Sequence, residues 1–138
     1  MPHIDAYLTF DGNCAEAMRF YERTLGGKLE TLMTHAESPM ADQTPPGSGD
    51  RILHARLVVD GRALMASDSP AGQPYQGMHG FALSLNYTDL AEARRAFDAL
   101  AAGGRVTMPL QKVFWADAFG MLVDRFGTPW MVNGVAAS

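Results

Sequence analysis

The sequence lacks several features that would each point to a particular class of protein. Cys14 is its only cysteine, so no disulfide can form within the chain. No apolar run approaches the roughly 20 residues that a membrane-spanning helix needs. The N-terminus has no basic segment followed by an apolar one, so no signal peptide is expected. These absences predict a cytoplasmic protein without a membrane partner.

Positive charge is also scarce. Lys and Arg together number 11 against 15 Asp and Glu, which gives a net charge of −4 at pH 7. Because nucleic acids are bound through concentrated positive charge, and the basic residues here do not cluster, no nucleic acid is expected as a partner. Apolar residues make up 47% of the 138 residues, which suits an ordinary globular domain with a real core.

An internal repeat organises the chain. The segment AEAMRFYE (residues 15–22) aligns with AEARRAFD (residues 91–98), and a Gly-Gly pair follows each of them. The two repeats extend over about residues 1–68 and 79–134. Neither repeat is large enough to bury its own sheet, so we expect a single domain over residues 1–138.

Each repeat predicts one helix among strands. Asn13 and Asp89 are candidate N-caps, apolar residues follow at helical spacing, and the Gly-Gly pair ends each helix. Strand-like segments flank both helices, and Asp60-Gly61 predicts a hairpin between two strands of the first repeat. The predicted order is β-α-β-β-β in each repeat, which is an α+β fold.

This pattern resembles the vicinal oxygen chelate superfamily, which includes glyoxalase I, the extradiol dioxygenases and the bleomycin and fosfomycin resistance proteins. The resemblance is closest to its PhnB-like branch, and it runs through AYLTFDGNCAEAMRFYERTLGG, ILHARLVVDGRALMASD, HGFALSL and GGRVTMPLQKVFWADAFGMLVDRFGTPWMV. It implies that each module forms a half-barrel with a cup on the side away from its helix. It also implies a homodimer.

Metal-dependent members of the superfamily carry their ligands on four strands. The resemblance places the equivalent positions at Ala6, Met65, Gly80 and Met131. Alanine and glycine offer no ligand atom, and a thioether is a poor ligand for divalent Zn, Ni, Fe, Mn or Mg. We therefore expect no metal at these positions. Two methionines would suit Cu(I), although methionine is far more often a packing residue.

A second set of ligands stays open if the alignment slips by one residue. It consists of His3, His54, Asp68 and His79. A one-residue shift in a strand moves a side chain to the opposite face, so His3 and His79, which lie near the expected positions Ala6 and Gly80, are expected to point toward the helices. If they did meet, they would support a metal-dependent enzyme of glyoxalase or dioxygenase type with displaced ligands.

Strand alternation assigns a lining to the cups. The candidate ligand-binding residues are His54, Arg56, Met65, Ser84, Trp115, Met131 and Asn133. Small-molecule pockets are usually apolar with a few polar groups, as this set is. His54 and Arg56 favour a neutral or anionic ligand, and they are expected to share a face with Ile52. Each also has a structural alternative, which is a hydrogen bond across the sheet for His54 and an ion pair for Arg56.

The sequence offers no other chemistry. It has no Gly-rich phosphate motif, no nucleophile elbow and no nucleotide-cofactor fold, so no cofactor is expected. The prediction is a PhnB-like protein that binds a small organic molecule in its cup without the usual divalent metal. Whether it turns that molecule over is left open. The alternatives are the metal-dependent enzyme with displaced ligands and a resistance protein that sequesters a drug.

Overall fold

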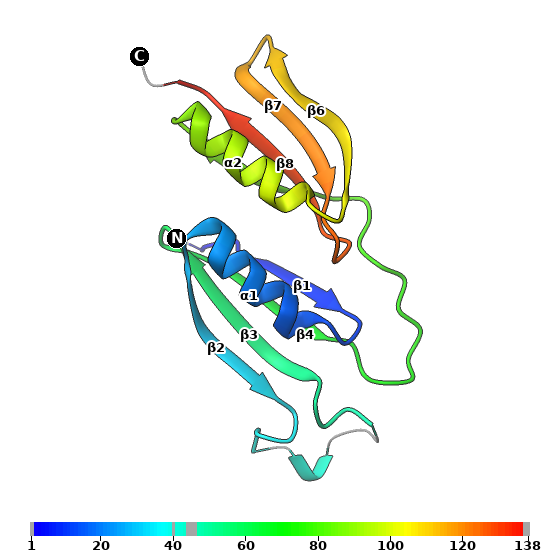
Figure 1. The fold of residues 1–138 in the computed structure, drawn as a ribbon. Coiled ribbons are helices and arrows are strands. Elements are labelled where there is room, and N and C mark those ends of the chain that lie inside the picture. Colours follow the sequence, from blue (N-terminus) through cyan, green and yellow to red (C-terminus); the bar gives the residue numbers. More distant parts are fainter. Residues whose placement is uncertain (1, 40, 44–46, 137–138) are drawn as a thin grey trace. The chain divides into compact units, whose positions relative to one another are not determined.

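The computed structural model describes residues 2–39, 41–43 and 47–136, and its strands form two four-stranded sheets. Figure 1 shows the elements, which are β1 (Ala6–Phe10), α1 (Cys14–Leu25), β2 (Lys28–Thr34), η1 (Ala41–Gln43), β3 (Ile52–Val59), β4 (Arg62–Asp68), β5 (Leu83–Tyr87), α2 (Leu90–Ala101), β6 (Arg105–Val113), β7 (Ala116–Val123) and β8 (Pro129–Gly134). The predicted α+β class and the β-α-β-β-β order of each repeat are confirmed.

The chain divides into two compact units, Met1–Gln76 and Gly77–Ser138, and each contains one repeat. The strand order is β1-β4-β3-β2 in the first unit and β5-β8-β7-β6 in the second. In both sheets the first strand pairs in parallel with the last, and the other pairs are antiparallel. That both repeats belong to one domain stays a prediction. No helix among the described residues is long and apolar enough to cross a membrane.

Each helix covers one face of the sheet in its own unit (Figure 1). The face under the helix is called here the covered face, and the other is called the open face. The buried residues of α1 are Cys14, Ala17, Met18, Phe20 and Tyr21, and those of α2 are Ala93, Ala96, Phe97 and Leu100. The core of each unit therefore lies between the helix and the covered face. Burying a large apolar side chain there contributes about 1.5–3 kcal/mol to the free energy of unfolding.

The two helices begin by different means. Asp89 caps α2 as predicted, because its side chain accepts hydrogen bonds from the backbone N–H groups of Ala91 and Glu92. Asn13, predicted to cap α1, makes no side-chain capping bond. The carboxylate that serves the start of α1 belongs to Asp68, which lies far along the chain at the end of β4.

Asp68 is buried and accepts three backbone hydrogen bonds. Its Oδ1 accepts from Gly12 N at 2.8 Å and from Cys14 N at 3.0 Å, and its Oδ2 accepts from Ile52 N at 2.9 Å. One side chain therefore joins the end of β4 to the start of α1 and the start of β3.

The first Gly-Gly pair ends α1 as predicted, whereas α2 ends at Ala101 with Ala102 as its C-cap, just before the second pair. Gly26 has a φ of 76°, in the left-handed region, and its N–H donates to the Glu22 carbonyl at 3.1 Å. Gly104 is needed for a different reason, because a Cβ there would meet the carbonyl oxygen of Val123 in β7. The first glycine of a pair thus supplies a backbone conformation, and the second allows close approach to a strand.

A β-bulge changes one predicted face. His54 pairs with Met33 and Ile52 with Thr34, so Leu53 is an extra residue in β3. Ile52 is only 4% exposed and lies with the core residues Ala55 and Leu57. The expectation that Ile52 shares a face with His54 is therefore wrong, since the bulge reverses the alternation at that point.

We expect Asp68→Ala to lower the free energy of unfolding by about 3 kcal/mol, because it leaves the buried N–H groups of Cys14 and Ile52 without an acceptor. The matched control is Asp89→Ala, which removes an exposed cap and should cost about 1 kcal/mol. Urea unfolding measures both values. Equal losses in the two variants would contradict the structural role assigned to Asp68.

Burial raises the pKa of the Cys14 thiol from 9.0 to about 12, and the negative charge of Asp68 adds to the increase. Above pH 9 the unfolded thiol ionises while the folded one keeps its proton, so the unfolded state binds fewer protons. The stability contributed by Cys14 is therefore complete below about pH 9 and falls as the pH rises, by at most about 1.4 kcal/mol per pH unit.

Urea unfolding at several alkaline pH values tests this expectation. Cys14→Ala should flatten the decline, and a thiol reagent should react with native Cys14 far more slowly than with the unfolded chain. Rapid labelling of the native protein near neutral pH would show that the thiol is not protected.

Candidate functional site

A row of paired residues crosses the open face of the first sheet. Tyr7 in β1 pairs with Met65 in β4, Met65 pairs with Arg56 in β3, and Arg56 pairs with Thr31 in β2. Paired residues of neighbouring strands project from the same face. Met65 and Arg56, both predicted for the site, therefore share this face with Tyr7.

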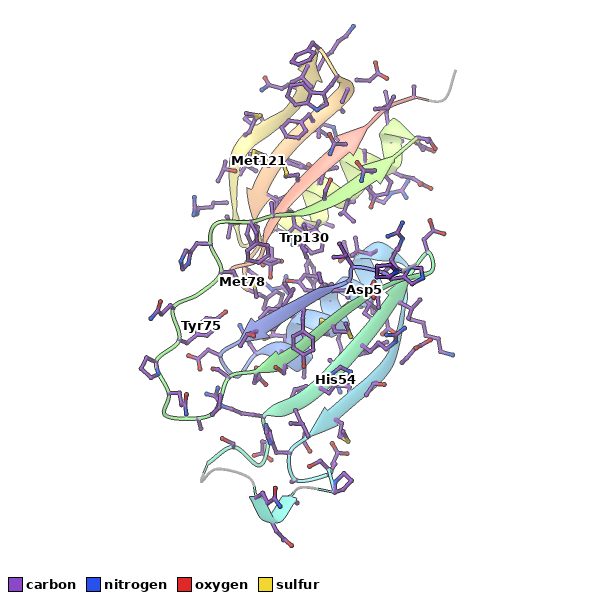
Figure 2. All side chains as sticks on the ribbon, turned by 180° about the vertical axis from the view of Figure 1, so that it is seen from behind. Asp5, His54, Tyr75, Met78, Met121 and Trp130 are labelled. Atoms are coloured by element: carbon purple, nitrogen blue, oxygen red, sulfur yellow. The ribbon has the colours of Figure 1, made fainter. Side chains whose placement is uncertain are left out.

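His54 lies next to this row, and Figure 2 shows it on the side of β3 turned toward the viewer. The Tyr7 hydroxyl is 3.3 Å from His54 Nδ1, and the two rings stack with centroids 5.9 Å apart. Tyr7 thus reaches across β4, which lies between β1 and β3 in the sheet. The cross-sheet hydrogen bond that the sequence offered as the alternative role of His54 exists.

Arg56 also makes the ion pair offered as its alternative. Its Nε donates to Glu30 Oε1 at 3.3 Å, and the two side chains are 42% and 45% exposed. Exposed pairs of this kind contribute about 0–1 kcal/mol. The ion pair therefore orients Arg56 without removing it from solvent.

Tyr75, also labelled in Figure 2, lies at the free edge of β1. Its hydroxyl donates to the Thr9 carbonyl at 2.6 Å. Burial raises the pKa of Tyr75, and the charges of Asp11 and Asp68 add to the increase. The phenol therefore keeps its proton, and this hydrogen bond, to a higher pH than an exposed tyrosine would.

A different row crosses the open face of the second sheet. Met108 in β6 pairs with Met121 in β7, Met121 pairs with Met131 in β8, and Met131 pairs with Ser84 in β5. Asn133 Nδ2 donates to Ser84 Oγ at 3.3 Å. Because methionine is unbranched and polarizable, three in a row make an apolar floor that adapts to different shapes.

Trp115 lies near this row through Phe119. Its ring meets Phe119 edge to face, with centroids 5.1 Å apart, and Phe119 pairs with Asn133. The Phe114 ring also meets Trp115 edge to face, with centroids 4.7 Å apart. A shallow depression of about 190 Å³ adjoins this cluster and is lined by Lys112, Val113, Phe114, Trp115, Ala116, Asp117 and Val135.

The seven predicted residues therefore fall into two groups. His54, Arg56 and Met65 lie on the open face of the first sheet. The others, which belong to the second unit, are Ser84, Trp115, Met131 and Asn133. Sequence reasoning missed Tyr7 and Met121. The alternation of buried Leu8 and Phe10 in β1 could have placed Tyr7 on the open face.

The positions expected for metal ligands do not share one type of face. Met65 and Met131 lie on the open faces, each in its own unit. Ala6 pairs with Leu64 and projects from the covered face, where Leu8 is buried, so Tyr7 takes its place beside Met65. Gly80 precedes β5, whose described bounds begin at Leu83. These residues do not fit a divalent ion.

The displaced ligand set does not assemble in the first unit. Asp68 is buried on the covered face, and both its oxygens accept backbone hydrogen bonds, whereas His54 projects from the open face. His3 precedes β1, and His79 is in the second unit. Within either unit, no three His, Cys, Asp or Glu side chains of the described residues lie close enough to hold a metal ion.

Comparison with known proteins identifies the group to which the chain is related. The family model of the Glyoxalase/Bleomycin resistance protein/Dioxygenase superfamily matches residues 3–132. Protein YjdN of Escherichia coli K12 is 38% identical, covering 96% of this chain and 95% of its own. The crystal structure of protein PA1353 from Pseudomonas aeruginosa is 49% identical with a TM-score of 0.92, covering 99% of this chain and all of that one.

A second solved structure shares the fold at lower identity. It is described as a putative 3-demethylubiquinone-9 3-methyltransferase, PhnB protein, from Bacillus cereus. It is 24% identical with a TM-score of 0.82, and the match covers 97% of this chain and 100% of that one. At this identity the similarity is one of fold.

The two tryptophans should respond differently to a soluble quencher. Trp115 is 51% exposed, whereas Trp130 is 2% exposed and donates through Nε1 to Asp124 Oδ2 at 2.9 Å. Acrylamide should therefore quench only part of the native fluorescence. Trp115→Phe should remove the accessible part and Trp130→Phe the protected part. An accessible fraction that survives in Trp115→Phe would contradict the exposed placement of Trp115.

Proposed function

Because the chain belongs to the Glyoxalase/Bleomycin resistance protein/Dioxygenase superfamily, we propose that it is a PhnB-like member that binds a small organic molecule on the open faces of its sheets. One observation carries the proposal. Large aromatic side chains of the kind usually buried in a core, such as Tyr7 and Trp115, are each 51% exposed and lie on or beside an open face. A face that keeps such residues in solvent is suited to a ligand.

The composition of these faces supports an organic ligand. Both rows contain methionine, and polar groups lie within them at Arg56 and Ser84 and beside the first row at His54. A mainly apolar surface with a few polar groups is typical of sites for small organic molecules. The apolar part provides affinity through burial, and the polar groups orient the ligand.

We propose that binding needs no divalent metal. The chemistry of the side chains supports this, since Met65 and Met131 occupy the two open-face positions where the superfamily resemblance would place ligands. Thioether sulfur suits soft ions such as Cu(I) and not Zn, Ni, Mn or Fe(II).

A homodimer and a cytoplasmic location complete the proposal. The dimer is implied by the family resemblance, and exposed apolar residues such as Phe81, Val106 and Phe114 offer surface for it. Sedimentation equilibrium should give twice the chain mass. The location rests on the composition, which predicts neither export nor membrane insertion.

The metal proposal is tested by elemental mass spectrometry of protein purified without chelators, and again after incubation with Zn, Ni, Mn and Fe(II) followed by dialysis. We expect far less than one retained ion per chain. One tightly held ion per chain would overturn the metal-free proposal and favour the enzyme with displaced ligands. His54→Ala would then show whether that residue is a ligand, with His35→Ala as the matched control.

Ligand binding is tested by thermal shift against a library of small organic molecules, followed by calorimetry of the hits. A ligand present at a hundred times its Kd should stabilise the protein by about 2.7 kcal/mol. Met65→Asp and Met131→Asp should weaken binding at the respective face. A library that yields no ligand would contradict the proposed function. Tight binding of a drug without turnover would favour the sequestering protein.

A further inference from the structure

The open face of the first sheet holds two polar side chains, His54 and Arg56, that are each oriented by one contact and keep other nitrogen atoms free of hydrogen bonds within the described residues. The Tyr7 hydroxyl bonds to His54 Nδ1, which leaves Nε2 of the same ring on the far side. Among the described residues, Nε2 has no hydrogen-bond partner within the protein. The contact with Tyr7 therefore fixes the ring while one nitrogen remains available.

Arg56 is positioned in the same way. Glu30 contacts its Nε, and the terminal nitrogens Nη1 and Nη2 have no partner within the described part of the chain. The two terminal nitrogens of a guanidinium match the two oxygens of a carboxylate. Because Arg56 and His54 are two residues apart on the same strand, both side chains project from the open face.

An apolar surface separates these groups from β1. Met65 lies in the row between Tyr7 and Arg56, and Tyr7 is 51% exposed. If one end of a ligand binds to Arg56, its other end would therefore lie over Met65. This arrangement calls for a molecule with an acidic group and a compact apolar body.

We infer that Arg56 and the Tyr7–His54 pair form the anion-recognising part of the ligand site, and that the ligand is a small organic carboxylate whose apolar body lies over Met65. The inference rests on the proposed function, since it names the ligand class of one of the proposed faces. Arg56 binds the carboxylate through its terminal nitrogens, His54 donates to it through Nε2, and Tyr7 positions the imidazole.

Matched acids and amides test the inference directly. Benzoate, phenylacetate and isovalerate are compared by calorimetry with benzamide, phenylacetamide and isovaleramide, which have the same shape without the charge. At least one acid should bind the full-length protein about tenfold or more tightly than its amide, because charge-assisted bonds to Arg are stronger than neutral ones. Inorganic phosphate, which has no apolar body, should bind more weakly than that acid.

Single substitutions identify the groups responsible. Arg56→Gln should weaken binding of the acid about tenfold or more and leave its amide unchanged. The matched control is Arg62→Gln, which makes the same charge change at the exposed start of β4 and should alter the Kd of the acid less than about twofold. Glu30→Gln should strengthen binding of the acid, because the amide oxygen can still accept from Arg56 Nε while a negative charge next to the site is removed.

The positioning role of Tyr7 needs its own readout. Tyr7→Phe keeps the ring and removes the hydroxyl, so it should weaken binding of the acid about threefold to tenfold. In the wild type, the acid should shift the NMR signals of the His54 ring, and in Tyr7→Phe the ratio of its two neutral tautomers should change even without ligand. An unchanged tautomer ratio would overturn the positioning role. Circular dichroism verifies that each variant is folded.

The outcomes separate this inference from the proposed function. If acids and amides bind equally well, or if Arg56→Gln has no effect, the anion site is overturned while the binding of organic molecules stands. If phosphate binds as tightly as the best acid, the site is a general anion site and the organic ligand class is wrong. If none of the three acids binds but neutral molecules from the library do, the inference is also overturned. If nothing binds at all, the proposed function itself fails.

Discussion

The buried carboxylate of Asp68 holds the first unit together where three of its elements meet. It accepts hydrogen bonds from the N–H groups of Gly12 in the turn before α1, of Cys14 at the start of α1 and of Ile52 at the start of β3. Buried donors left without an acceptor would each cost about 1–3 kcal/mol, so these hydrogen bonds tie the helix to the sheet in one arrangement. In the second unit the buried carboxylate of Asp124 joins residues that are close together in the chain. It accepts hydrogen bonds from the backbone N–H groups of Phe126 and Thr128, between β7 and β8, and from the indole N–H of Trp130 in β8. The arrangement of helix on sheet decides which face of each sheet is core and which remains open.

The two open faces share a backbone design but differ in chemistry. On the first, Tyr7, His54 and Arg56 place polar groups beside one methionine. On the second, methionine occupies neighbouring positions on three strands, and Ser84 ends the row. A common fold therefore supports two unlike surfaces, which is the usual relation of fold to function. Met65 and Met131 lie at corresponding places in the two rows, where a carboxylate would have favoured a hard metal ion and a thioether favours an apolar ligand.

Much of the architecture follows from local sequence. The order of strands and helices, the start of α2 at Asp89 and the hairpin at Asp60-Gly61 were all predicted, and both hairpin residues have positive φ values, of 49° and 77°. These features depend on residues close together in the chain, whose preferences for caps and turns act before distant contacts form. The placement of His54 and Arg56 together on one strand face was predicted for the same reason, because a strand alternates its side chains.

The remaining features were decided only when distant segments met. A bulge at Leu53 moved Ile52 into the core, and the parallel register of β1 with β4 placed Tyr7, and not Ala6, beside Met65. A shift of one residue in a register reverses every side chain of a strand, yet it leaves no mark in the local sequence. The sequence by itself thus determined the elements and the alternation of side chains within a regular strand. The tertiary structure alone decided which residues of different strands meet, because register and bulges depend on the packing of the whole unit.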